Sequence, residues 1–574
     1  MKHLLKQLKA YRKESILGPL FKLLEAGFEL LVPLLVAAMI DQGVKLGDKS
    51  VIVRMSLMMV GLGLIGLLCS VTAQYFAAKA AVGSTTRLRR ALFAHLQTLS
   101  YTELDTIGAS TMLTRLTSDM NQVQSGVNLT LRLALRSPFV VFGAMVMAFT
   151  IDVHAAAVFA IVIPILFAVV FGVMIVCIPL YRKVQARLDR VLGMTRENLT
   201  GVRVLRAFGR EEEQKREFSA RNDALTKEQN HVGRISVLLN PVTYVIINLA
   251  IVALIRTGAL RVESGALSQG DVIALYNYMS QILVELIKLA NLVLNITRAA
   301  ACCNRIGAVL EIESSQHSPQ TEPETTADAP AIEFRRAGLR YAGAGGDALD
   351  GISFHAEKGQ TIGVIGGTGS GKTTLINLIP RFYDATEGSV LVDGVPVEQY
   401  PLESLRRRIG VVPQKAVLFH GTIRENLLWG DPDAGDGTLR EALRAAQAEE
   451  IVQGKEGGLD FEIEQGGRNL SGGQRQRLTI ARALVRKPEI LILDDSASAL
   501  DFATDAALRK ALRALPERPT VVIVSQRTSS IRHADQIIVL DNGHMVGLGT
   551  HEELLRTCEV YREIHESQYK KEER

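Results

Sequence analysis

Residues Gly366–Thr374 read GGTGSGKTT, and this motif indicates the fold of the second half of the chain. It follows a short apolar segment, Gln360–Ile365, and precedes an apolar run that begins at Leu375. This is the pattern G-x-x-x-x-G-K-[ST] between a predicted strand and a predicted helix, the context that makes the pattern specific. Glycines let backbone N–H groups approach phosphate oxygens, and the helix N-terminus adds a favourable dipole. We therefore predict a phosphate-binding loop; the alternative is a chance glycine-rich turn.

The chemistry of this loop points to a nucleotide with Mg²⁺. The Lys372 ammonium is expected to reach the β- and γ-phosphates, and the Thr373 hydroxyl to ligate Mg²⁺. The predicted phosphate-binding residues are Gly366, Gly367, Thr368, Gly369, Ser370, Gly371, Lys372, Thr373 and Thr374. A second apolar strand, Ile490–Leu493, ends in Asp494 and Asp495. Because such a strand end commonly holds the magnesium shell, Asp494 is the predicted metal ligand and Asp495 the predicted general base for water.

A second anion-binding edge is predicted between these two motifs. Asn469–Arg477 reads NLSGGQRQR and precedes a helical run, Leu478–Val485. Ser471 can cap that helix, and the two following glycines allow close approach of a ligand. The predicted contact residues are Ser471, Gly472, Gly473 and Gln474. A simple solvent-facing helix cap is the alternative.

The composition indicates a membrane protein. The chain has 574 residues, of which 47% are hydrophobic and 22% charged, and the mean hydropathy is +0.16. The net charge of +5 is small for this length and does not support a nucleic-acid-binding polycation. Five cysteines are too few and badly placed for a disulfide framework, which fits a reducing compartment for the soluble mass.

The apolar residues gather in six predicted membrane spans, each long enough to cross a hydrocarbon core. They lie at about residues 16–40, 52–78, 131–151, 155–180, 235–261 and 270–297. We predict a transmembrane domain at 1–312, a linker at 313–330 rich in Ser, Thr, Glu and Pro, and a nucleotide-binding domain at 331–574. The fold class is an all-α six-span domain with long cytoplasmic helical extensions, followed by an α/β phosphate-loop ATPase domain.

The long loops set the expected orientation in the membrane. Residues 79–130 and 181–234 are long and polar and carry Arg and Lys clusters, as does the N-terminus. Positive residues remain on the cytoplasmic side, so both termini, both long loops and the ATPase domain are expected in the cytoplasm. The protein is then a multi-pass protein of the cytoplasmic membrane.

Polar residues inside the spans allow two interpretations. In the last span, Gln281, Glu285, Lys288, Asn291 and Asn295 share one helical face. This face is either a packing surface with a Glu285–Lys288 pair or the lining of a transport path. Glu25 and Glu29, with Lys22, leave the same two alternatives in the first span. An acidic cavity would favour amphipathic cations.

The three motifs in this order, on six spans, resemble an ABC exporter half-transporter over nearly the whole chain. In that family two nucleotide domains pair head to tail, with each ATP between the phosphate loop of one and the LSGGQ edge of the other. The resemblance implies that Tyr341 stacks on adenine, a core tyrosine being the alternative. It implies that Gln414 touches Mg²⁺ and water and links to the membrane domain. It also implies that Asp501, in Ser498-Ala-Leu-Asp, couples the two sites.

The resemblance extends to the segments that connect the two domains. Tyr101–Ile107 and Val204–Glu212 lie at the turning points of the long loops and resemble the family's two coupling helices. Gln465–Gly467 resembles the segment that meets them. It lies just before Leu470–Gln474, the LSGGQ signature motif, which forms the signature edge of the domain.

Two residues depart from the family pattern. Asp495 stands where Glu is usual, and Gln526 stands where His is usual. Asp is shorter by one methylene, and a misplacement near 1 Å can cost about 10²-fold in rate. Gln can donate a hydrogen bond to the γ-phosphate but cannot titrate as an imidazole does. Neutral variation, with Asp495 still acting as base, is the alternative.

This pattern resembles the degenerate-site subunit of bacterial heterodimeric multidrug ABC exporters. It implies ATP-driven export of hydrophobic or amphipathic compounds, with ATP and Mg²⁺ as cofactors and hydrolysis mainly at the partner's site. The implied partners are a second ABC half-transporter, the transported compound and membrane lipid, with no nucleic acid. A lipid or peptide exporter of the same architecture and a membrane-tethered regulatory ATP-binding subunit are the alternatives.

Overall fold

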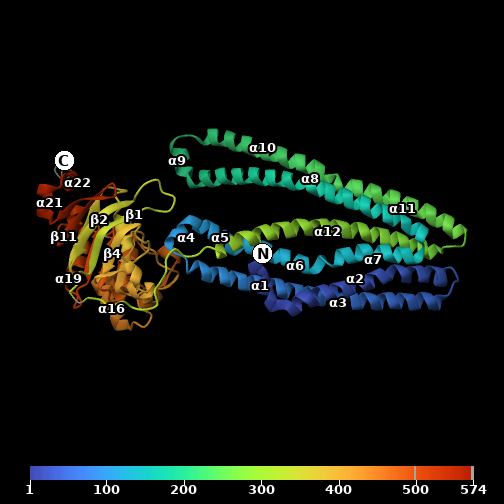
Figure 1. The fold of residues 1–574 in the computed structure, drawn as a ribbon, viewed down its shortest axis with the longest axis horizontal. Helices are drawn as coiled ribbons and strands as arrows, with labels where there is room; N and C mark the ends of the chain where they lie inside the picture. The colour runs from blue at the N-terminus through green and yellow to red at the C-terminus, as the bar shows by residue number, and fades with distance from the viewer. Residues whose placement is uncertain (327, 497–498, 570–574) are drawn as a thin grey trace. The chain divides into compact units, whose positions relative to one another are not determined.

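The computed structural model describes residues 1–326, 328–496 and 499–569 (Figure 1). These residues divide into two compact units. The first unit comprises Met1–Gln97 and Ser110–Ile312, and the second comprises Thr98–Ala109 and Glu313–Arg574. The short segment Thr98–Ala109 therefore groups with the second unit, although the sequence inserts it into the first.

The first unit is helical. Within the described ranges, six helices are long and apolar enough to cross a membrane: Lys2–Val44, Lys49–Leu96, Ala109–Ile151, Val153–Thr200, Glu211–Glu263 and Gln269–Leu310. A helix of 48 residues is about 70 Å long, more than twice the thickness of a hydrocarbon core. The prediction of six long apolar helices is thus confirmed, and the long polar loops continue these helices, as the sequence predicted.

Local breaks divide these long helices into elements. In chain order they are α1 (Lys2–Leu8), η1 (Lys9–Tyr11), α2 (Arg12–Ala38), η2 (Met39–Val44), α3 (Lys49–Leu96), α5 (Ala109–Thr114), η3 (Arg115–Asp119), α6 (Met120–Leu133), α7 (Arg136–Ile151), α8 (Val153–Thr200), α9 (Val202–Ala207), α10 (Glu211–Val237), α11 (Leu239–Glu263) and α12 (Gln269–Leu310). Pro138 and Pro241 stand in the first turns of α7 and α11. A proline is tolerated there because the first-turn N–H groups have no intrahelical partner.

Small residues bring α2 and α3 close together, and Figure 1 shows the two helices side by side. A β-carbon on Gly18 would lie 3.3 Å from the backbone nitrogen of Ala77. Ala73 and Ala77 of α3 are fully buried. Small residues allow this close backbone approach, which is the usual basis of packing between membrane helices.

A charge cluster with Arg136 and Glu285 buried at its centre connects α2, α7 and α12. The guanidinium of Arg136 on α7 donates to Glu29 of α2, at 2.6 Å, and to Glu285 of α12. Glu285 also accepts hydrogen bonds from Ser137 and from Lys288, each at 2.8 Å. The Glu285–Lys288 pair of the packing alternative is therefore present. Each carboxylate of this cluster is paired with a cation, so the cluster does not form an acidic cavity.

The second unit contains three sheets among the residues that the structure describes. A four-stranded sheet has the order β2-β1-β4-β5, a six-stranded sheet has the order β12-β11-β3-β10-β9-β6, and β7 pairs with β8. The strands are β1 (Ile332–Leu339), β2 (Leu349–Ala356), β3 (Thr361–Gly366), β4 (Glu387–Val392), β5 (Val395–Pro396), β6 (Ile409–Val412), β7 (Gly421–Thr422), β8 (Glu462–Ile463), β9 (Ile490–Asp494), β10 (Thr520–Val524), β11 (Gln536–Asp541) and β12 (His544–Gly549).

Helices accompany these strands along the second unit. They are α4 (Tyr101–Ile107), α13 (Lys372–Leu378), η4 (Val397–Gln399), α14 (Leu402–Arg408), α15 (Ile423–Leu428), α16 (Asp436–Ala445), α17 (Glu449–Gln453), η5 (Gly458–Asp460), η6 (Gln465–Gly467), α18 (Gly472–Val485), α19 (Phe502–Arg513), α20 (Thr528–Ile531), α21 (His551–Thr557) and α22 (Glu559–Tyr569).

The six-stranded sheet explains why two distant motifs meet. Strands β3 and β9 both pair in parallel with β10, so the carboxyl ends of all three lie at one edge. In open α/β sheets, ligands bind beyond these carboxyl ends. The phosphate-loop motif after β3 and the aspartates at the end of β9 are thereby brought to the same edge, which gives the predicted α/β ATPase domain its site.

Candidate functional site

The loop between β3 and α13 has a backbone that only glycine suits at several positions. Gly369 and Gly371 have φ angles of +84° and +98°, which favour glycine. A β-carbon on Gly366 would lie 2.2 Å from the carbonyl oxygen of Leu540, and one on Gly371 would lie 2.8 Å from that of Ala348. The loop is therefore shaped by its glycines into a tight turn at the N-terminus of α13.

Two side chains of this loop offer donors to an anion. Lys372 Nζ donates to the carbonyl oxygens of Gly366, at 3.0 Å, and Gly367, at 2.6 Å. Burial lowers the pKa of Lys372, as expected for a desolvated cation. The buried hydroxyl of Ser370 has no hydrogen-bond partner among the described residues. A buried donor without a partner is costly, and a phosphate oxygen is a suitable acceptor for it.

Two candidate oxygen ligands for Mg²⁺, Thr373 at the start of α13 and Asp494 at the end of β9, lie close together at the edge of the sheet. Thr373 Oγ1 is 3.1 Å from Asp494 Oδ2, and burial raises the pKa of Asp494. In the part of the chain that the structure describes, no group of three or more His, Cys, Asp and Glu could hold a metal. Mg²⁺ commonly uses only one or two carboxylates together with phosphate oxygens and water. The residues present fit that ligand set.

Asp495 has an unusual backbone, with a φ angle of +45°. Asp tolerates this left-handed conformation better than most residues do. Its backbone N–H donates to the carbonyl oxygen of Val524 at 3.0 Å, and its carboxylate is hydrogen-bonded by Gln414. Burial raises the pKa of Asp495, while the charge of Lys372 opposes that effect. The structure thus brings Asp495, Gln414 and Lys372 together.

Gln526 follows β10 at the same edge, because Val524 pairs with Asp494 in the parallel register. Its side chain is exposed. The backbone carbonyl of Gln526 accepts a hydrogen bond of 2.7 Å from Gln568 Nε2. Gln568 lies on α22, and no motif in the sequence pointed to it.

Ser471 forms a complete capping box with Gln474 at the start of α18. Gln474 N donates to Ser471 Oγ at 3.3 Å, and Ser471 N donates to Gln474 Oε1 at 3.0 Å. The predicted cap is confirmed. A β-carbon on Gly472 would meet nothing within 4 Å, and Ser471 is exposed. This edge is therefore open to a ligand from outside the chain.

Asp501 caps another helix. Its carboxylate accepts from Thr504 N at 2.8 Å and from Thr504 Oγ1 at 3.0 Å, at the start of α19. These hydrogen bonds lower the pKa of Asp501. Ser498, the first residue of the motif that contains Asp501, lies outside the described residues.

Tyr341 belongs to a group of aromatic residues that connects the phosphate-loop helix with α4. It is half-buried, and its hydroxyl donates to Thr374 Oγ1 at 3.1 Å. Its ring stands edge-on to Tyr383, with centroids 5.1 Å apart. The Tyr383 hydroxyl donates to Asp105 of α4 at 2.5 Å, and Tyr101 of α4 packs on Phe382 at 4.8 Å. Both residues that Tyr341 contacts here, Thr374 and Tyr383, belong to the phosphate-loop helix or to the segment that follows it.

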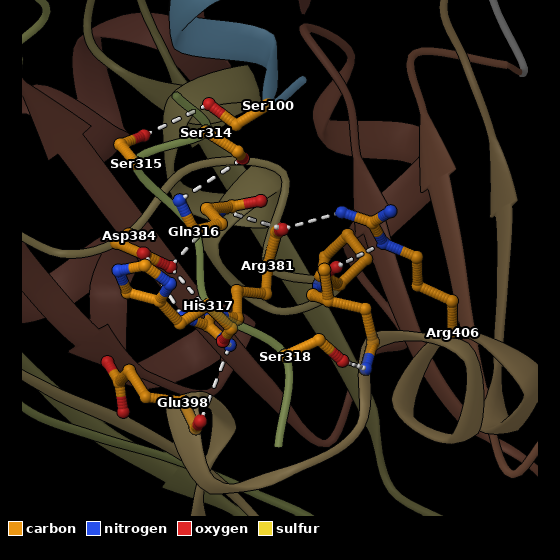
Figure 2. Close-up of polar contacts among 12 residues, drawn as sticks. Ser100, Ser314, Ser315, Gln316, His317, Ser318, Arg381, Asp384, Glu398 and Arg406 are labelled. Carbon is orange, nitrogen blue, oxygen red and sulfur yellow. Dashed lines mark hydrogen bonds and ion pairs between the residues drawn. The ribbon is translucent and has the colours of Figure 1, made fainter. Parts of the chain in front are cut away.

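Residues Ser314–Ser318, here termed the strap, run along the segment Arg381–Asp384 that follows α13 (Figure 2). Gln316 Nε2 donates to the carbonyl oxygen of Arg381 and to Asp384 Oδ1, each at 3.2 Å. The buried guanidinium of Arg381 binds Asp384 at 2.7 Å and the carbonyl oxygen of His317 at 3.0 Å. The strap lies in the region predicted to be a linker from its composition alone, and these contacts were not predicted.

The strap also holds the start of α4. Ser315 Oγ lies 3.1 Å from Ser100 Oγ, and Ser315 N donates to Glu103 Oε1 at 3.3 Å. Ser100 and Glu103 form the capping box of α4. Helix α4 covers Tyr101–Ile107, the range that resembles the first coupling helix.

Val204–Glu212, the range that resembles the second coupling helix, is not a single helix. A short helix, α9, covers Val202–Ala207, and α10 begins at Glu211. Val204–Glu212 therefore contains a helix end, a turn and a helix start. Gln465–Gly467 forms the 3-10 turn η6, in which Gly466 and Gly467 have φ angles of +73° and +68°.

The fold and the site together define a membrane protein with a fused phosphate-loop nucleotide-binding unit. Residues 15–286 match the ABC transporter transmembrane region family, and residues 349–498 match the ABC transporter family of ATP-binding domains. The chain therefore belongs to the ABC transporter family. It is a half-transporter, with one membrane region and one ATPase region, and such a half requires a second half to form a complete transporter.

Full-length relatives support this assignment. An uncharacterized ABC transporter ATP-binding protein of Mycobacterium tuberculosis is 38% identical over 98% of this chain and 97% of its own length. The protein YfiB of Bacillus subtilis, with the same description, is 36% identical over 100% of this chain and 99% of its own. The ATP-dependent lipid A-core flippase of Chromobacterium violaceum is 30% identical over 99% and 97%.

The fold is that of a solved ABC exporter. A structure of a bacterial Atm1-family ABC exporter with ATP bound aligns with a TM-score of 0.80, covering 97% of this chain and 98% of the other. The sequence identity is 23%, so this likeness concerns the fold.

Proposed function

We propose that this chain is one subunit of a heterodimeric ABC exporter whose own ATP site is impaired in hydrolysis and whose signature edge completes the partner's site. The observation that carries the proposal is the contrast between Asp495 and Ser471. Asp495 occupies the position of the general base with a short side chain and a left-handed backbone, whereas Ser471 forms an intact capping box.

ATP is bound in this proposal by the loop after β3. Lys372 leaves its carbonyl partners for the β- and γ-phosphates, Ser370 gains an acceptor for its buried hydroxyl, and Tyr341 stacks on adenine. Thr373, Asp494 and Gln414 would hold Mg²⁺, which draws charge from the phosphates. The 3.1 Å approach of Thr373 to Asp494 supports this assignment.

Hydrolysis at this site is expected to be slow for two reasons. The carboxylate of Asp495 is one methylene shorter than that of Glu, and it is engaged by Gln414. A general base must lie within hydrogen-bond reach of its proton, and an error of about 1 Å can cost about 10²-fold. The second reason is Gln526, which can donate a hydrogen bond but has no titrating ring.

The signature edge, in contrast to the site at Asp495, keeps the residues that the family uses there. Ser471, Gly472, Gly473 and Gln474 present backbone N–H groups at the N-terminus of α18, where the helix dipole favours an anion. The exposure of Ser471 suits a ligand supplied by the partner subunit. Asp501, which stabilises the start of α19, then connects the two sites across the dimer.

Transport is driven in this proposal by closure of the two nucleotide-binding units around ATP. Helix α4 carries that movement, because Tyr383 and Ser315 hold it to the unit that contains the phosphate loop. Both termini and the ATPase unit lie in the cytoplasm, as the positive charge of the long loops favours.

The transported compounds are hydrophobic or amphipathic. The ion-paired state of Glu285 and Glu29 does not favour a preference for cations. A lipid is the second candidate cargo, because a relative that is 30% identical is an ATP-dependent lipid A-core flippase.

The proposal is tested on the full chain purified alone in lipid nanodiscs. Its ATP turnover is expected to be only slightly above that of Lys372→Ala, which removes the phosphate-binding ammonium. The double variant Asp495→Glu/Gln526→His is expected to raise turnover by at least about tenfold, within the range that side-chain placement controls. Asp495→Asn is the matched control, because Asn also tolerates a positive φ, and it is expected to stay at the Lys372→Ala level.

Rapid, substrate-stimulated turnover by the wild-type chain alone would overturn the proposal. Copurification with a second half-transporter that carries Glu after its magnesium-binding Asp is the positive result. ATP binding without any movement of substrate by the assembled pair would favour the regulatory-subunit alternative.

A further inference from the structure

One side chain of the C-terminal helix forms three hydrogen bonds with the loop that carries Gln526. Gln568 Nε2 donates to the backbone carbonyl of Gln526 at 2.7 Å. Gln568 Oε1 accepts from the backbone N–H of Thr528 at 2.9 Å and from the Thr528 hydroxyl at 3.0 Å. A single amide therefore satisfies three polar groups on both sides of Arg527.

Helix α22, which carries Gln568, is firmly anchored. Tyr561 has none of its surface exposed and belongs to the main core of the unit. Its hydroxyl lies 2.7 Å from His551 Nδ1 on α21. His565, one turn before Gln568, lies 3.3 Å from Thr528 Oγ1. The position of Gln568 is thus set by contacts that do not depend on Gln568 itself.

The loop that Gln568 holds is directly linked to the end of β9. Val524 pairs with Asp494 in the parallel register, and its carbonyl oxygen accepts the backbone N–H of Asp495. Ser525 N donates to the carbonyl of Val364 on β3. The chain then leaves the sheet, so the two residues after Ser525 lack strand pairing. Within the loop, Arg527 N donates to Ser525 Oγ at 3.0 Å, and from outside the loop Gln568 binds the carbonyl oxygen of Gln526.

We propose that Gln568 is a positioning residue that fixes the backbone on either side of Arg527 and so aims the side chain of Gln526 at the nucleotide. This inference rests on the proposed function for the role of Gln526, but the position of the loop can be measured independently. Because the amide of Gln568 both donates and accepts, a carboxylate at this position retains the two bonds from Thr528 and loses the bond to Gln526.

The first experiment measures hydrogen–deuterium exchange of the full chain in nanodiscs, over peptides that cover residues 524–530. Gln568→Ala is expected to raise exchange in this segment by about tenfold, a factor that corresponds to about 1.4 kcal/mol of lost hydrogen-bond stabilisation. Gln568→Glu is expected to give a smaller rise, because the acceptor for Thr528 remains. Ser567→Ala is the matched control, since among the described residues the Ser567 hydroxyl donates to the carbonyl of Ile564 in its own helix.

Equal exchange in Gln568→Ala and Ser567→Ala would overturn the inference. The melting temperature of each variant is measured in parallel. A loss of exchange protection that extends over α22 as a whole, rather than over residues 524–530, would also overturn it, because it would indicate unfolding of the helix.

The second experiment places Gln568→Ala in the Asp495→Glu/Gln526→His background. There kcat is expected to fall about tenfold while KM for ATP changes little, because the loop acts on the reacting phosphate rather than on ATP binding. An unchanged kcat in a background whose turnover has risen would overturn the inference. If the background itself gains no turnover, the proposed function fails, and the exchange measurement still decides the role of Gln568.

Discussion

The guanidinium of Arg136 and the carboxylate of Glu285 form a buried ion pair between α7 and α12, with Nη1 2.5 Å from Oε1. Their exposed fractions are only 7% and 3%. The two residues are 149 positions apart in the chain. Glu29 on α2 completes the pairing of the guanidinium, so one arginine connects three helices of the membrane unit.

Replacing Arg136 by Met is expected to destabilise the membrane unit by about 3 kcal/mol, because the buried carboxylate of Glu285 loses its buried cation and keeps only Lys288 as a partner. The double variant Arg136→Met/Glu285→Met is expected to recover most of that loss, since it removes both charges of the buried pair and leaves Glu29 and Lys288, whose side chains are partly exposed. Thermal unfolding in nanodiscs measures the effect. Arg221→Met is the control, because its ion pair with Glu217 is exposed, and it is expected to leave the melting temperature unchanged. A double variant no more stable than Arg136→Met would contradict the prediction.

Tyr383→Phe is expected to weaken the coupling between ATP turnover and transport. The substitution removes the hydroxyl that binds Asp105 and keeps the ring that packs on Tyr341. One hydrogen bond to a charged acceptor is worth about 1.5–3 kcal/mol. We expect the amount of substrate moved per ATP to fall by about tenfold in the assembled pair, with ATP affinity retained.

The matched partner variant is Asp105→Ala. Because both substitutions remove the same contact, the double variant is expected to be no worse than either single one. Additive losses in the double-mutant cycle would show that Tyr383 and Asp105 act separately.

Ser471→Ala is expected to lower ATP turnover at the partner's site while this chain still binds ATP through its own loop. The loss of the cap costs α18 about 1 kcal/mol, and the exposed hydroxyl is lost as a ligand contact. Thr550→Ala is the matched control, because Thr550 forms the same capping box with Glu553 on α21. Equal stability losses with turnover reduced only in Ser471→Ala are the expected result. A similar loss of turnover in both variants would assign the effect to stability.

Binding of Mg²⁺–ATP is expected to weaken on acidification from pH 7 to pH 5. Burial raises the pKa of Asp494 and the pKa of Asp495 above the ordinary value of 3.8, so protons begin to bind these carboxylates at a higher pH than they bind exposed aspartates. A protonated carboxylate is a poor metal ligand, so metal affinity falls as the pH falls. A fluorescent ATP analogue measures the effect, with chelated Mg²⁺ as the control. An identical pH profile without Mg²⁺ would refute this explanation.

Much of the fold could be predicted from local patterns. The six spans follow from apolar length, and the phosphate loop from a glycine pattern between a strand and a helix. The cap at Ser471 follows from a serine three residues before Gln474. In each case the deciding interaction lies within a few residues, where sequence spacing and geometry agree.

The unpredicted features all depend on contacts between distant residues. The sequence left open whether Glu285 packs or lines a path, because helical periodicity identifies a face and not what covers it. In the structure Glu285 is paired with Arg136, which lies 149 residues away in the chain. Gln316 stands in a segment of linker composition, and Gln568 has no neighbouring motif. Neither position carries a local signal, since each acts by hydrogen bonds to backbone carbonyls whose location only the tertiary structure defines.

The strap that contains Gln316 and the helix α4 determine where the chain can be cut to obtain the ATPase unit. A fragment cut at residue 331, where the first strand of the ATPase begins, would leave Arg381, Asp384 and the rings of Phe382 and Tyr383 without the groups that cover them. The compact unit that contains the phosphate loop is therefore built from two segments that are separate in the sequence. A fragment that retains these contacts must combine residues 98–109 with a C-terminal portion starting at Glu313.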